Sequence, residues 1–161
     1  LGTLPHAIKI VVNGNHENNA PWKHEVRNVV SNAIFLLNES FTIPHGPGQG
    51  IKLYGTDFSW PLRVGRHPMY EAIDHDVSIL ISHGPAAGYV DGEKGCDALL
   101  ARCKDLATMK DSNLQLVIGG HIHSAYGIAQ GTGECARIRF VNAASCGEYR
   151  KVVHEPIVLD I

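Results

Sequence analysis

Three short loops in this sequence combine histidine with glycine, and each directly follows an apolar run. They are Gly14-Asn15-His16-Glu17, Ser82-His83-Gly84-Pro85 and Gly120-His121-Ile122-His123. Imidazole nitrogens suit Zn, Mn, Fe or Ni, and an asparagine carbonyl adds a neutral oxygen ligand. If the preceding strands are parallel, their carboxyl ends share one rim of a sheet, where open α/β folds bind ligands. The three loops together therefore predict a site for a first-row metal ion.

Each loop taken alone has a simpler interpretation. His83 by itself would more often be a hydrogen-bonding loop residue, and Asn15 would be a left-handed turn residue. His121-x-His123 is a stronger signal, because both rings can reach one or two metals. The metal hypothesis rests on the combination of the three loops after three apolar runs.

Other motifs that could carry chemistry are incomplete. His16-Glu17 does not continue as H-E-x-x-H, because position 20 is Ala20, so the zinc-protease motif is absent. The glycines at 46, 48 and 50 do not form a dinucleotide-binding G-x-G-x-x-G. Cys146 has no apparent paired base, so its expected role is that of a buried thiol.

Two acidic segments lie close to apolar runs. Asp74-His75-Asp76 precedes the run at 77–81, which places it at the opposite end of the sheet from His83 and predicts a surface turn. Asp57 follows the run at 51–54, so it could lie at the same rim as the histidines.

Apolar periodicity alternates between strand and helix patterns, which predicts an α/β or layered α+β fold in one domain over residues 1–161. Helices are expected from 22 to 34 and over 96–107. Residues 34–43 are ambiguous, and the segments 35–37 and 41–43 could form a hairpin. Residues 56–75 are expected to form a long surface loop. Strands are expected at 8–12, 51–54, 77–81, 114–118, 138–141 and 157–159.

Composition excludes several classes of protein. The chain has 161 residues, 44% of them hydrophobic, and a formal charge of -2, which is typical of one globular domain. No basic patch indicates binding to nucleic acid or to an anionic membrane, and the apolar runs are too short to span a bilayer. The four cysteines show no C-x-x-C spacing; four free thiols suit a reducing compartment and predict a cytoplasmic protein.

The three loops resemble the second half of the calcineurin-like metallophosphoesterase signature. The flanking residues 1–5, 53–55, 95–96, 126–127, 141–143 and 156–158 are similar to those of the small metallophosphoesterase-domain-containing proteins, which are relatives of class III cyclic-nucleotide phosphodiesterases. The likeness covers essentially the whole chain.

The resemblance implies an α/β/β/α sandwich with two divalent metals, Mn, Fe, Zn or Mg, at the strand ends. By motif, Asn15, His83 and His121 match ligands of the second metal, and His123 matches a ligand of the first. His16 matches the catalytic histidine, which donates toward the phosphate or the leaving oxygen. The implied function is hydrolysis of a small phosphodiester, such as a cyclic nucleotide, by a hydroxide that two metals activate.

The sequence departs from the family pattern at its beginning. The family's upstream D-x-H and G-D-x-x-D motifs do not precede Gly14 here, so we expect the C-terminal portion of a longer domain that lacks its first strands. The four retained ligands are all neutral. The alternative hypothesis is therefore a truncated or degenerate, non-catalytic module that binds a metal or nucleotide and serves regulation or interaction. A smaller departure is Ala86, where the family usually has a second proline.

Overall fold

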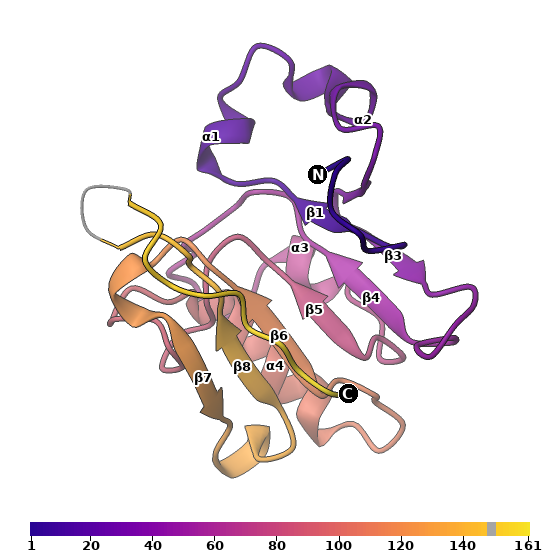
Figure 1. Ribbon diagram of the computed structural model, residues 1–161. Helices are drawn as coiled ribbons and strands as arrows, with labels where there is room; N and C mark the ends of the chain where they lie inside the picture. The colour runs from indigo at the N-terminus through magenta and orange to yellow at the C-terminus, as the bar shows by residue number, and fades with distance from the viewer. Residues whose placement is uncertain (148–150) are drawn as a thin grey trace.

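The computed structural model describes residues 1–147 and 151–161, which form a mixed α/β fold with two sheets (Figure 1). The expected α/β class is therefore confirmed. The strands are β1 (Ile10–Val12), β2 (Ile34–Leu36), β3 (Glu39–Thr42), β4 (Lys52–Gly55), β5 (Ile79–Ile81), β6 (Leu116–Gly119), β7 (Gly127–Gln130) and β8 (Arg139–Asn142). The helices are α1 (Asn15–Asn18), α2 (Val26–Val29), α3 (Pro68–Glu71) and α4 (Asp97–Thr108), with single 3-10 turns η1 (Lys23–Glu25), η2 (His123–Ala125) and η3 (Gly133–Cys135).

The larger sheet has six strands in the order β3-β4-β5-β6-β8-β7. Its four inner strands run parallel, and the edge strands β3 and β7 are antiparallel to their neighbours. The smaller sheet is the parallel pair β1 and β2. The carboxyl ends of β5 and β6, which precede His83 and His121, are thus neighbours in one sheet.

Alternating side chains of the large sheet enter two separate apolar clusters, as the two-residue period of a strand requires. Leu80 and Val117 face α4, where they join Leu99 and Leu106 in the larger cluster. Their neighbours face the opposite side, which β1 and the C-terminal segment cover; the buried members there are Leu53, Ile79, Leu116 and Val141. In Figure 1 the C-terminal segment crosses one face of the sheet while α4 lies behind the other.

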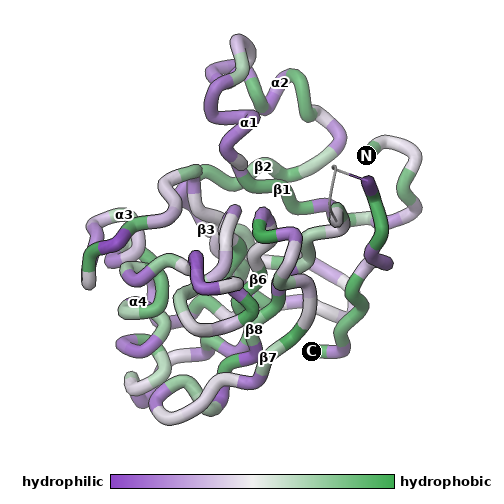
Figure 2. Tube along the Cα trace, turned by 90° about the vertical axis from the view of Figure 1, so that its left-hand side faces the viewer, coloured by the Kyte–Doolittle hydropathy of each residue, from purple (hydrophilic) through white to green (hydrophobic). Residues whose placement is uncertain are grey.

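The small sheet and its short helices complete the layers. In Figure 2, α1 and α2 lie beyond β1 and β2 as seen from the six-stranded sheet, and Figure 1 shows them beyond β1. The implied α/β/β/α order is therefore present, with only two strands in the second sheet among the residues that the structure describes.

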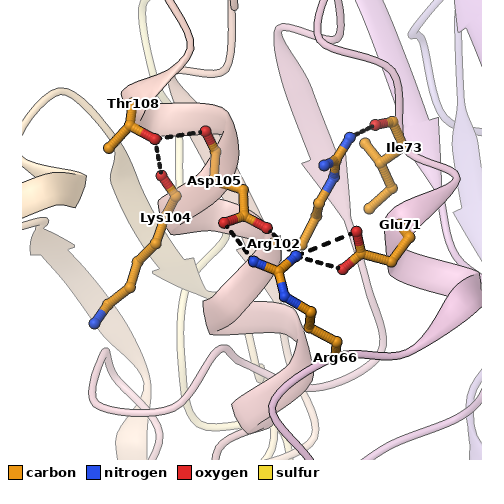
Figure 3. A network of polar contacts seen from close by, with 7 residues as sticks. All are labelled: Arg66, Glu71, Ile73, Arg102, Lys104, Asp105 and Thr108. Atoms are coloured by element: carbon orange, nitrogen blue, oxygen red, sulfur yellow. Dashed lines mark hydrogen bonds and ion pairs between the residues drawn. The ribbon is translucent and has the colours of Figure 1, made fainter.

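Polar contacts attach α4 to the segment before β5 (Figure 3). The guanidinium of Arg66 donates to Asp105 on α4, with one N–O distance of 2.9 Å, and to Glu71 at 3.2 Å. The buried Arg102 donates to the carbonyl of Ile73. These contacts hold the segment at 66–73 against α4, which is why Tyr70 and Ile73 are buried within a region expected to be a surface loop.

Several sequence expectations on the elements are wrong. The helix from 22 to 34 is only the turn η1 and the short α2, and Ile34 already belongs to β2. Residues 35–43 do not form a hairpin, because β2 pairs with β1 while β3 pairs with β4. Residues 157–159 pack on the sheet as a segment without strand pairing. Strand β7 was not expected at all.

Across the residues that the structure describes, no helix combines the length and the apolar character needed to cross a membrane.

Candidate metal centre

Two sheets deliver the three predicted loops to one place. His83 follows β5 and His121 follows β6 in the large sheet, whereas Asn15 begins α1 directly after β1 in the small sheet. The expectation of one shared parallel sheet was thus correct for two of the loops and wrong for the third. The loops meet because β1 packs on the face of the large sheet, where Ile10 contacts the apolar cluster.

Three donor atoms converge at this point. The Nε2 atom of His83 lies 2.9 Å from the Oδ1 atom of Asn15 and 2.9 Å from the Nδ1 atom of His121. The two imidazole rings are 4.5 Å apart between centroids. One amide oxygen and two imidazole nitrogens are a chemically suitable set for a first-row divalent metal. The structure therefore brings together Asn15, His83 and His121, as the sequence predicted.

The loop after β1 is shaped to bring Asn15 close to His83. The Gly14 backbone N–H donates to the Oε2 atom of Glu17 at 3.1 Å, which closes the first turn of α1. A Cβ atom at position 14 would lie 2.7 Å from the His83 ring, a distance that real Cβ contacts do not reach. The glycine is needed here because the backbone itself passes against the imidazole.

His121 adopts a left-handed backbone conformation with φ of 67°, which is uncommon for a residue other than glycine. Such strain persists only where surrounding contacts impose it. The buried side chain of Asn142 supplies one of them, because its Nδ2 atom donates to the carbonyl of Ile122 at 2.9 Å; it also donates to the carbonyl of Val90 at 2.9 Å. Asn142 thus connects the histidine loop to the loop after β5.

His16 and His123 lie next to the donor cluster without joining it. His16 is exposed on α1, and its charge is close enough to lower the pKa values of His83 and His121. The Nδ1 atom of His123 lies 3.2 Å from the carbonyl oxygen of Gly147, which leaves Nε2 to face a ligand. A backbone carbonyl on one ring nitrogen is the arrangement that orients metal-bound histidines.

Both clustered histidines are held in their neutral form. Burial, followed by the charge of His121, lowers the pKa of His83 to about 4. Burial and the charge of His123 lower the pKa of His121. A neutral imidazole has a free lone pair for a metal at neutral pH, so the electrostatics fit the donor chemistry.

The donor set contains no acidic side chain. Within residues 1–147 and 151–161, no three His, Cys, Asp or Glu side chains gather in a group that could hold a metal. Asn15, His83 and His121 are not such a group, because the third donor is the amide of an asparagine. These residues fit one divalent ion through three neutral protein ligands.

The other acidic candidates lie where the sequence indicated. Asp57 is at the rim, where its Oδ1 atom accepts from Asn13 at 2.6 Å. Asp74 and Asp76 lie in an exposed turn at the start of β5 and contact Lys52, with the Asp76 oxygen at 2.7 Å. The expectation that Cys146 is a buried thiol is wrong: the residue is half-buried, and its backbone forms an isolated antiparallel β-bridge with Val152 at the edge of the described segment.

A cavity of about 950 Å³ adjoins the donor cluster on the side of His121 and His123. Trp60 forms one wall, and its ring lies edge-on to His121 with centroids 4.9 Å apart. The indole N–H donates to the carbonyl of Pro85 at 3.0 Å. Sequence reasoning missed Trp60 and the role of Asn142, because neither belongs to a motif with a local spacing. The sequence signal for Asn142 was its position as a polar residue directly after the apolar run at 138–141.

Replacement of Asn142 by alanine is expected to lower stability. Two carbonyls of inner loops would each lose a donor, which costs about 2–4 kcal/mol in total. Thermal unfolding followed by circular dichroism measures this, with the exposed Asn113→Ala as the matched control. A melting temperature equal to that of the control variant would contradict the supporting role of Asn142.

Acid is expected to destabilise the metal-free protein through His83. The unfolded side chain titrates near pH 6.5 and the folded one at about 4, so between these values only the unfolded chain binds the proton. The free energy of unfolding therefore falls as the pH drops from about 6.5 toward 4. Urea unfolding at about pH 7.5 and about pH 5 measures the change. His83→Gln should make the pH dependence shallower, and an unchanged dependence would contradict the assignment.

Comparison with known proteins adds independent information. The family model described as calcineurin-like phosphoesterase matches residues 2–125. Human metallophosphoesterase domain-containing protein 1 is 28% identical over 201 residues, covering 100% of this chain and 57% of the relative. A UPF0046 protein of Caenorhabditis elegans is 25% identical over 189 residues, covering 100% of this chain and 64% of the relative. A probable rhamnogalacturonate lyase C of Emericella nidulans is 30% identical over 142 residues, covering 79% of this chain and 13% of that protein. The chain thus spans less than two thirds of the length of these relatives.

Proposed function

Because the chain belongs to the calcineurin-like phosphoesterase family, we propose that it takes part in the metal-dependent hydrolysis of a small phosphodiester, such as a cyclic nucleotide. One observation supports this proposal above all: the Nε2 atom of His83 lies 2.9 Å from donor atoms of both Asn15 and His121. The exposed His16 follows Asn15 directly in the chain. A cavity of about 950 Å³ adjoins this cluster at His121.

In this proposal Asn15, His83 and His121 hold one divalent metal, either Mn, Fe, Zn or Mg. When bound, such an ion supplies the Lewis-acid charge that polarises a phosphoryl oxygen and lowers the pKa of water. Asn142 keeps the histidine loop in its strained conformation, so that the donor atoms are already in place before binding. Preorganised ligands bind without the cost of ordering the loop.

His16 is assigned the proton transfer. It lies on α1 next to Asn15, and its exposed ring makes no hydrogen bond to any of the residues that the structure describes. A protonated imidazole in this place can donate to the leaving oxygen as the ester bond breaks. The His16 ring is available for this proton transfer because it does not bind the metal in this proposal.

A second metal is proposed at His123. The contact of its Nδ1 atom with the Gly147 carbonyl leaves Nε2 as the donor. Only neutral side chains contribute here, so a pair of dications has no anionic ligand among the four predicted residues. This second site is therefore expected to bind more weakly than the first.

The neutral donor set also favours a second candidate function. A chain that holds one ion through three uncharged ligands can serve as a metal- or nucleotide-binding regulatory or interaction module without catalysis.

Metal content and phosphodiester hydrolysis separate the two functions. The chain is loaded with Mn²⁺ or Zn²⁺, and bound metal is counted by plasma mass spectrometry. Hydrolysis of bis(p-nitrophenyl) phosphate is then compared between this chain and a version extended by the upstream residues of its gene. Metal-dependent hydrolysis that rises with the extension supports the enzyme. Stoichiometric metal without hydrolysis in either form supports the regulatory module, and no bound metal contradicts both the enzyme and a metal-binding module.

We further propose a reducing compartment, such as the cytoplasm. All four cysteines are free thiols, and Cys96, Cys103 and Cys135 are buried. Free buried thiols are typical of proteins kept under reducing conditions.

A further inference from the structure

Two cationic side chains line the cavity beside the histidines, and the proposed metal chemistry uses neither. We propose that Arg63 and Lys94 form a subsite for a second anionic group, carried by the substrate outside the phosphate that is hydrolysed. This inference rests on the proposed function, since it names the substrate class of the same site: a phosphodiester that bears a further phosphate or carboxylate.

Backbone contacts bring the two cations to the same wall. The N–H of Leu62 donates to the Sγ atom of Cys96 at 3.3 Å, and the carbonyl of Leu62 accepts from Asp97 at 3.1 Å. Arg63 directly follows Leu62, and Lys94 precedes Cys96 by two positions. Both side chains line the cavity that also contains His121 and His123.

The loop that carries Lys94 is built to hold its shape. The carboxylate of Asp91 accepts from the backbone N–H groups of Gly88 at 2.8 Å and Gly95 at 3.0 Å. The carbonyl of Val90 accepts from Asn142, which also supports the His121 loop. One buried asparagine thus donates both to the loop that carries Lys94 and to the loop that carries His121.

The charged Lys and Arg side chains that line the cavity within the described residues are Arg63 and Lys94. No Asp or Glu side chain lines it among the residues that the structure describes. Within the same residues, neither Arg63 nor Lys94 forms an ion pair, whereas Arg27, Lys52 and Arg66 all do. Two cations with no acidic partner among the described residues, beside the proposed phosphate site, are suited to a second anion, which Arg in particular binds through charge-assisted hydrogen bonds.

The remaining walls show what connects the two anionic groups. Trp60 and Ile122 give the cavity an apolar side, and the ring of His154 stacks on Tyr126 with centroids 4.2 Å apart. The Trp60 indole packs directly against Gly84, where a Cβ atom would be 2.3 Å from the ring. Flat aromatic walls favour a substrate with a planar ring, as a nucleotide has.

The test uses the metal-loaded chain and titration calorimetry with adenosine, adenosine 5'-monophosphate and adenosine 3',5'-bisphosphate. The bisphosphate is expected to bind about tenfold more tightly than the monophosphate. The double variant Arg63→Ala/Lys94→Ala should lose this gain while binding the monophosphate with less than about a threefold change. Arg63→Lys/Lys94→Arg should retain the gain, and the exposed Lys110→Ala is the matched control.

Equal affinities for monophosphate and bisphosphate would overturn the subsite. So would a double variant that weakens both ligands equally, because the cations would then serve only the phosphate at the metal. A protein that discriminates the two ligands but hydrolyses no diester retains the subsite and loses the proposed enzyme function. A protein that hydrolyses diesters but binds the monophosphate and the bisphosphate equally well would retain the proposed enzyme function and lose the subsite.

Discussion

Replacement of His121 by alanine is expected to remove the metal from the donor cluster and abolish metal-dependent hydrolysis. In the proposed site the imidazole is one of three protein donors, and its Nδ1 atom lies 2.9 Å from the Nε2 atom of His83. Changes to residues that merely orient a ligand already cost about 10–100-fold in metal affinity, so loss of the ligand itself should cost at least about 100-fold. Isothermal titration with Zn²⁺ or Mn²⁺ measures the affinity directly, independent of turnover.

The control for this variant is His75→Ala. His75 is exposed in the turn at the amino end of β5, so its removal deletes an imidazole at the opposite end of the strand from His83. We expect it to bind metal like the unchanged protein. If His121→Ala bound metal with the affinity of His75→Ala, the shared donor cluster would be wrong and the predicted metal centre with it.

Replacement of His16 by alanine is expected to separate proton transfer from metal binding. The ring is exposed and lies outside the cluster of donor atoms, so the metal affinity should stay unchanged. Loss of a general acid should lower turnover by about 10²–10⁴-fold. Steady-state kinetics and metal titration on the same preparation provide both quantities.

The chemistry of the leaving group sharpens this second prediction. A diester with an alkoxide leaving group needs a proton as the bond breaks, whereas p-nitrophenolate leaves without one. The His16→Ala defect should therefore be much larger for the alkyl ester than for the p-nitrophenyl ester. The nearby exposed His24→Ala is the control. Equal defects for both esters would contradict the role of His16 as the acid, and loss of metal would identify it as a ligand instead.

Local patterns were sufficient for the elements that surround the site. Leu99, Cys103 and Leu106 recur on one face, and their period correctly predicted α4. The apolar runs before His83 and His121 correctly predicted β5 and β6. These predictions succeeded because a helix buried on one face has apolar residues at a regular spacing, and a buried central strand is a continuous apolar run.

Expectations failed where the partner of a segment is distant in the sequence. Residues 34–36 pair with β1, and residues 39–42 pair with β4, so the apparent hairpin is divided between two sheets. The apolar residues Ile157 and Leu159 cover the sheet without pairing to it. An apolar run specifies that a segment is buried, but not whether it gains a strand partner.

The sequence alone determined the chemistry at the strand ends: an amide and imidazoles beside glycines, in an order that resembles one family of hydrolases. The tertiary structure decided that Asn15 arrives from a different sheet than His83 and His121, and that Asn142 holds their loops together. It also placed Arg63 and Lys94 on the wall of one cavity. The division has a physical reason: residue types set which ligands can bind, whereas their convergence depends on packing between segments far apart in the chain, which no local pattern records.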